Sequence, residues 1–250
     1  MKKTFGLLAI LALLLPSLGY SDGVSFRLGY YIPQAKSDLW QIEFENMSYS
    51  KSNFQTAVLG FTYEHFLTRE ISVAIGIDIY DKIERGNYRD YVGYTFTEGD
   101  FAFPSSYKGD FDISHQLSVS MTPIQASLKI APLGRKSGFM PYFGGGVSLY
   151  IWSVKLQGDM IDFTDVWTYD TGSGTIDIYG IKPTNAREER QLTLGFHGFA
   201  GLMIPIARRA AVEAEFKYTY GKGTLKYPFE GFGKFDLSGY QISLGINYLF

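Results

Sequence analysis

The chain has 250 residues, with 23 basic against 25 acidic side chains and no cysteine. The balanced charge gives no electrostatic basis for binding nucleic acid, and the lack of cysteine excludes disulfides, thiolate chemistry and a lipidated N-terminal cysteine. Aromatic residues make up 17% of the chain and glycines number 28. Transmembrane barrels favour this composition, because rings lie at the membrane interfaces and glycines relieve crowding in a curved sheet.

The N-terminus has the pattern of a secretory signal. Two lysines precede the apolar segment Phe5–Leu15, and small residues follow at positions that suit signal peptidase, either Ser17 and Gly19 or Gly19 and Ser21, so cleavage is expected after Gly19 or Ser21. The apolar run is shorter than the ~20 residues that span a bilayer, and no later segment is apolar enough for a transmembrane helix. We therefore expect a cleaved signal peptide, 1–21, followed by one mature domain, 22–250.

The mature part alternates between apolar and polar residues with period two, which is typical of strands with two different faces. The clearest example is the isoleucine ladder from Ile71 to Ile79. In the fourth segment the apolar parity shifts at Pro123, where we expect a β-bulge. The predicted strands occupy residues 24–32, 57–64, 71–80, 117–130, 143–151, 192–202, 212–220 and 240–250.

Short and long connections alternate along the chain. The short ones are 65–70, 131–138 and 205–210, whereas 81–113, 155–190 and 221–236 are long polar or glycine-rich segments. This pattern predicts a closed, eight-stranded, antiparallel up-and-down transmembrane β-barrel with short periplasmic turns and long extracellular loops. Ten strands are the alternative, if residues 167–181 form an extra hairpin.

Alternation alone fits a soluble sandwich as well as a membrane barrel, whose apolar face points outward. The signal, the loop asymmetry and the ending Tyr248-Leu249-Phe250 favour the barrel. In pattern and ends, Gly23–Phe250 resembles the small outer-membrane barrels, which include OmpA-type transmembrane domains, OmpX/Ail-type and OmpW-like proteins. The resemblance implies a porin-like fold in the outer membrane of a Gram-negative cell. It also implies contact with outer-membrane lipids and lipopolysaccharide, and with assembly machinery through the strand that ends in Phe250; the subfamily stays open.

Charged residues recur on the face that would line the lumen. In an eight-stranded barrel the interior is just wide enough to be filled by side chains, so a paired network that plugs the bore is favoured over an ion path. We interpret the network as structural, with these members: Arg27, Glu64, Asp78, Lys129, His197, Glu213, Glu215 and Lys217.

The positions of the histidines bear on whether the chain is a lipid A deacylase, because these enzymes place His and Ser two residues apart on one strand face. His65, His115 and His197 have no serine at that spacing, and His115 and Ser118 fall on opposite faces. We therefore expect no enzyme, no catalytic residue and no cofactor. The loop aspartates lack EF-hand spacing, so we expect no metal site.

The predicted loops are rich in aromatic residues, which can bind partners when exposed. The leading hypothesis is a non-enzymatic barrel with an adhesive or protective role carried by its external loops; the external ligand is open. A narrow channel for small or hydrophobic solutes, as in OmpW-like proteins, is second, and a lipid-modifying enzyme is third. The loop aromatics are Trp40, Phe44, Tyr49, Tyr88, Tyr91, Tyr94, Phe96, Phe101, Phe103, Tyr107, Trp167, Tyr169, Tyr227, Phe229 and Phe232.

Overall fold

The computed structural model describes residues 22–134 and 138–250, and the predicted signal peptide, 1–21, lies outside them. Within these ranges, no helix has the length and apolar character needed to cross a membrane. The elements are β1 (Gly23–Pro33), α2 (Asp38–Asn46), η1 (Lys51–Phe54), β2 (Thr56–Phe66), β3 (Ile71–Asn87), β4 (Tyr91–Phe96), β5 (Gly99–Pro104), β6 (Ser114–Ile130), β7 (Met140–Asp170), β8 (Thr175–Pro205), β9 (Ala210–Gly223), β10 (Phe235–Asp236) and β11 (Gly239–Leu249).

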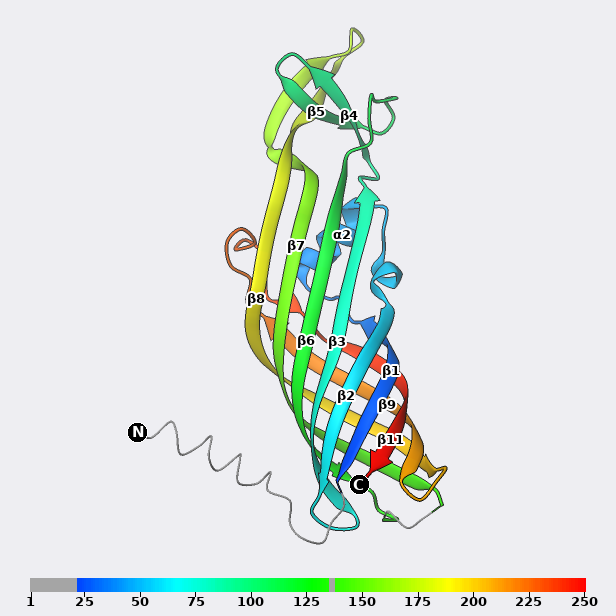
Figure 1. Ribbon diagram of the computed structural model, residues 1–250. Helices are drawn as coiled ribbons and strands as arrows, with labels where there is room; N and C mark the ends of the chain where they lie inside the picture. Colours follow the sequence, from blue (N-terminus) through cyan, green and yellow to red (C-terminus); the bar gives the residue numbers. More distant parts are fainter. Residues whose placement is uncertain (1–21, 135–137) are drawn as a thin grey trace, which may run out of the picture.

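Eight of the strands close into an antiparallel barrel. They pair in the order β1, β2, β3, β6, β7, β8, β9 and β11, and β11 returns to β1 with Gly23 opposite Leu249. The start of β1 and the end of β11 lie on the side of the barrel that carries the short turns, which we call the turn end. The opposite side of the barrel is the loop end (Figure 1). The predicted eight-stranded closed barrel is confirmed. Apart from β4, β5 and β10, which are not barrel strands, each strand pairs with the next barrel strand along the chain.

The apolar face of the strands points outward. Phe26, Leu28 and Leu244 are 61–67% exposed, and Ile75 and Ile79 of the isoleucine ladder are 42% and 54% exposed. Tyrosines border this apolar surface toward the loop end, at Tyr30, Tyr220 and Tyr240, and Tyr248 and Phe250 border it at the turn end. Such an outer band between two aromatic girdles is the pattern of membrane barrels.

The long connections are more ordered than the sequence predicts. Residues 155–190, expected to be a loop, continue β7 and β8, which are 31 residues long each. At roughly 3.3 Å per residue these strands span about 100 Å, far more than the ~25 Å apolar band of a membrane barrel. The sequence misses this extension because strand above the membrane has no lipid to impose an alternating pattern.

The part of the sheet that extends beyond the barrel is what we call the head (residues 88–113 and 159–182). The β4–β5 hairpin pairs with β8 through Phe101 opposite Gly180, which gives the order β7, β8, β5, β4 (Figure 1). Residues 167–181 are therefore the tip of the β7–β8 hairpin, and they add no strands to the barrel. The segment 81–113 likewise contains the end of β3 and this hairpin.

The predicted bulge at Pro123 is wrong. The register between β3 and β6 is the same on both sides of it, with Ile77 opposite Ile124 and Tyr80 opposite Met121. Odd-numbered residues of β6 point inward along its whole length. The parity shift in the sequence arises because the interior itself changes from polar near the turn end to apolar near the loop end.

Candidate functional site

The turn-end half of the bore holds a charged network centred on Lys217. The Lys217 ammonium donates to Asp78 Oδ2 at 2.8 Å and to Gln125 Oε1 at 3.0 Å, and lies 3.6 Å from Glu215 Oε1. Arg27 lies 3.7 Å from both Asp78 and Glu215. All of these charged side chains are buried, so each depends on the others to replace lost water.

Glycines make room for Arg27 between its neighbours. A Cβ at Gly60 would lie 2.4 Å from Asp78 Oδ1, and one at Gly245 would lie 2.7 Å from Arg27 Cγ. Both glycines stand opposite Arg27 in the sheet. A side chain at these two positions would therefore collide with Asp78 and with the stem of Arg27, whose guanidinium reaches Glu213 at 3.9 Å.

A second group lies closer to the turn end. Lys129 Nζ donates to Glu64 Oε2 at 2.9 Å and sits 4.0 Å from the centre of the Tyr142 ring, while Ser72 donates to the other oxygen of Glu64. The eight residues predicted to line the lumen are thus all buried in one half of the bore, in contact with each other or with neutral polar groups.

His197 joins the network through hydroxyl groups. Its Nε2 lies 2.8 Å from Ser127 Oγ and its Nδ1 lies 2.8 Å from Ser148 Oγ. A serine next to a histidine can form a nucleophile–base pair, yet the cavity that Ser127 and His197 line measures about 30 Å³. That volume suits one or a few water molecules and has no room for a substrate.

The loop-end half of the bore is apolar. Leu117, Val119, Val154 and Leu156 of β6 and β7 point inward and are at most 2% exposed. Trp152 follows on the same face of β7 and donates its indole N–H to Thr193 at 3.0 Å. Because these strands are apolar inside here and apolar outside nearer the turn end, their hydrophobicity alone does not identify the lipid face.

A cap closes the apolar half. Trp40 of α2 stacks on Phe235 with ring centres 5.2 Å apart, and Phe235 stacks on Trp152 at 5.7 Å. Phe54 of η1 packs edge-on against Trp40, and the Trp40 indole donates to the Asp236 carbonyl at 3.1 Å. The loops that carry α2, η1 and β10 therefore meet over the bore and join the barrel core.

A buried polar cluster ties this cap to β6. Glu43 of α2 lies 2.8 Å from His115 Nε2 and accepts a hydrogen bond from Tyr49, and the Tyr88 ring packs edge-on against His115. Burial and the Glu43 carboxylate raise the pKa of Tyr49, and burial raises the pKa of Tyr88 to about 12. Both phenols therefore stay protonated, and Tyr49 remains a donor to Glu43.

Removing His115 should loosen the cap. In His115→Ala, Glu43 stays buried with Tyr49 as its remaining partner, which should cost about 1–3 kcal/mol locally. We expect amide hydrogens of α2 to exchange roughly tenfold faster or more, while barrel amides are unchanged. His115→Gln keeps a donor near Glu43 and should recover much of the protection. Unchanged exchange in α2 of His115→Ala would contradict this role.

Internal cavities in the described parts of the barrel are small. Two measure about 30 Å³ and one about 10 Å³. The charged network fills one half of the bore and the aromatic cap fills the other. In this conformation the interior is packed with side chains, as expected for eight strands.

The head has an aromatic face on one side of its four strands. Phe103 is 2% exposed, and its ring lies 4.5 Å from that of Tyr94 and 5.1 Å from that of Tyr169. The Phe101 ring lies 5.4 Å from that of Trp167, which is 50% exposed. The hydrophobic cluster on this face consists of head residues, and its central members Phe101, Phe103 and Ile178 are at most 7% exposed, because rings from both outer strands, Phe96 and Tyr169, meet over them.

Several of these residues escape the sequence analysis. Gln125, Ser25 and Thr62 share the inward parity of the charged residues, so alternation could have identified them. Glu43 gives no such signal, because its partner His115 is 72 positions away and the helix that carries it lies inside a predicted loop. The separation of the interior into a polar and an apolar half was also missed.

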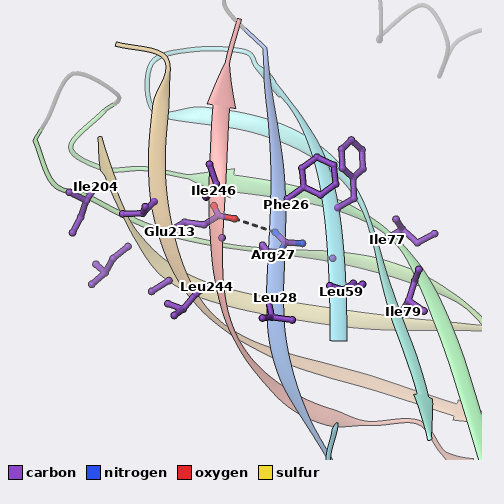
Figure 2. Close-up of a pocket in the computed structure, with 16 residues that line it drawn as sticks. Phe26, Arg27, Leu28, Leu59, Ile77, Ile79, Ile204, Glu213, Leu244 and Ile246 are labelled. Carbon is purple, nitrogen blue, oxygen red and sulfur yellow. Dashed lines mark ion pairs between the residues drawn. The ribbon is translucent and has the colours of Figure 1, made fainter. Parts of the chain in front are cut away.

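A wide hollow lies on the outer wall. A groove of about 900 Å³ runs over β8, β9, β11, β1, β2 and β3, where apolar side chains point outward (Figure 2). The Arg27–Glu213 ion pair, the dashed line in Figure 2, belongs to the inner face of the same strands. The groove is lined by Phe26, Leu28, Leu59, Phe61, Ile77, Ile79, Leu202, Ile204, Val212, Leu244 and Ile246, among others.

Comparison with known proteins finds similarity in structure only. No family model and no curated protein sequence matches the chain. Neisserial surface protein A (14% identity, TM-score 0.44) and outer membrane protein OprG from Pseudomonas aeruginosa (13%, 0.47) each match 92% of this chain and 97% and 96% of their own. The attachment invasion locus protein Ail of Yersinia pestis matches with 10% identity and a TM-score of 0.43, over 92% and 97%. These scores are low, and the fold assignment rests on the strand pairing of this chain.

Proposed function

We propose that this protein is an integral outer-membrane barrel that works as a closed, non-enzymatic scaffold and holds an extracellular head for surface interaction, in adhesion or protection. The observation that carries the proposal is the contrast between bore and head. The polar half and the apolar half of the bore are both filled, whereas two 31-residue strands continue beyond it to build a head with exposed aromatic rings.

The outer wall supports the membrane location. Apolar side chains that are largely exposed ring the barrel, an arrangement that water would penalise and that acyl chains favour. The 900 Å³ groove would then hold acyl chains of outer-membrane lipids or lipopolysaccharide. Assembly machinery would bind the last strand, where Phe250 follows the outward residues of β11.

A planar-bilayer recording combined with a head-trimmed variant tests the proposal. Gln157 stands opposite Asn185 and Asn87 stands opposite Ser114, so each pair can be joined by an Asn-Gly turn that removes the head. We expect both proteins to fold, with heat-modifiable migration on gels, and to show no steady conductance. Cells that display the intact chain should bind target surfaces or cells, and cells that display the trimmed chain should not.

Two results would contradict the proposal. Steady unit conductance of the intact protein would favour the narrow channel, which is the second hypothesis. Equal surface binding by intact and trimmed chains would remove the head from the function. Lipid A mass analysis with and without expression tests the third hypothesis, since an acyl-editing enzyme would change the lipid A masses.

A further inference from the structure

The head combines exposed aromatic rings on β7 with a strong excess of negative charge. Its carboxylates number ten and its cations three, although the whole chain is almost neutral. One of the three cations, Lys182, is already bound at 2.7 Å from Asp162 and 3.4 Å from Asp165. The carboxylates are Asp90, Glu98, Asp100, Asp110, Asp112, Asp159, Asp162, Asp165, Asp170 and Asp177.

The exposed rings lie beside these carboxylates. Trp167 is 50% exposed and donates its indole N–H to Asp165 Oδ1 at 2.9 Å, which fixes the ring on the edge of the aromatic face. Tyr169, two residues further along β7, is 38% exposed and contacts Phe103. Asp170 follows it directly on β7, and Asp177 of β8 stands opposite Thr168 of β7, so strand alternation puts both carboxylates on the face opposite the rings. The β7 edge therefore carries aromatic rings on one face and negative charge on the other.

β7 also offers backbone groups. β6 accompanies β7 only as far as Gly158, and beyond that point β8 is its single partner strand. The amide of Ile161 on this edge donates to the Tyr88 hydroxyl at 3.3 Å. From Val166 to Asp170 the edge of the head is open among the described residues, next to Trp167 and Tyr169.

We propose that the head binds a basic polypeptide segment, rich in arginine or lysine, along the β7 edge and the exposed rings of Trp167 and Tyr169. This inference rests on the proposed function and names the class of its partner. Guanidinium groups stack on Trp and Tyr rings and pair with carboxylates, so one arginine-rich segment matches both features. Exposed Trp and Tyr are also the residues that most often dominate protein interfaces, and the negative field speeds the approach of a cation.

A fluorescent nine-residue arginine peptide tests the proposal by anisotropy against the full chain in phosphatidylcholine nanodiscs. Empty nanodiscs and a nine-residue glutamate peptide are the background probes. We expect saturable binding of the arginine peptide alone, weakened by salt because exposed charges are screened. Trp167→Ala with Tyr169→Ala should weaken binding about tenfold or more.

Two further variants separate recognition from damage to the head. Asp170→Asn with Asp177→Asn leaves the rings in place and should weaken binding and flatten its salt dependence. Tyr227→Ala removes an 85% exposed ring outside the head and should leave binding unchanged. Equal binding by the wild type and the Trp167/Tyr169 variant would overturn the proposal. So would salt-insensitive capture of a neutral oligosaccharide without peptide binding, or self-association through the head.

The outcomes also separate this inference from the proposed function. If head-dependent binding to cells persists while the arginine peptide fails to bind, the partner class is wrong and the scaffold function stands. If the intact protein conducts ions steadily, the scaffold function itself is wrong.

Discussion

Replacing Lys217 by methionine is expected to destabilise the barrel by about 3 kcal/mol, because it leaves Asp78 and Glu215 buried without their nearest cation. The value lies at the low end for a broken buried pair, since Arg27 still lies 3.7 Å from both carboxylates. Urea unfolding in phospholipid vesicles, followed by tryptophan fluorescence, measures the free energy of unfolding. Loss of heat-modifiable migration at a lower temperature should accompany it.

Two companion variants show whether the charge network is responsible. Adding Asp78→Asn to Lys217→Met removes the stranded charge and should recover most of the lost stability. Lys222→Met makes the same change on the same strand at an exposed position, and should stay within about 0.5 kcal/mol of wild type. If Lys217→Met were as stable as wild type, the bore would have to be hydrated well enough to solvate Asp78, and the plug would be a conducting path instead.

The barrel could be predicted from sequence because the membrane and the lumen impose opposite preferences on alternate residues. β1 shows this directly: Phe26 and Leu28 face outward, and Ser25 and Arg27 face inward. The charged network follows from the same alternation, since each of its eight predicted members falls at an inward position.

The alternation of apolar and polar residues does not identify the two faces of a strand where the lumen is as apolar as the lipid. In β6 the inward Leu117, Val119 and Met121 are as apolar as the outward Ile124, so the sequence suggests a bulge that the register excludes. The strands of the head could not be predicted either, because the sequence of a strand in water with aromatic residues on one face resembles that of an aromatic loop. The Glu43–His115 contact depends on a helix seated in the bore, and no local pattern specifies that docking.

Arginine in place of Leu244 tests the placement of the outer wall in lipid. Leu244 lies midway along β11 between Tyr240 and Tyr248 and is 67% exposed. An arginine at the midplane of a bilayer costs a barrel about 2–4 kcal/mol, whereas the same change on a surface in water costs at most about 0.5 kcal/mol. We therefore expect Leu244→Arg to lower the free energy of unfolding in vesicles by about 2–4 kcal/mol.

Arginine substitutions at two other positions, one near the edge of the apolar band and one in the head, are the matched controls. Tyr248→Arg, near the turn-end girdle, should cost only about 0–1 kcal/mol. Val166→Arg, at a 52% exposed aliphatic position in the head, should cost no more than about 0.5 kcal/mol. A cost that rises toward the middle of β11 and vanishes in the head requires hydrocarbon around the barrel and water around the head. If all three arginines were tolerated equally, the outer wall would lie in water, and the exposed ladder of leucine and isoleucine would need a protein partner instead of a membrane.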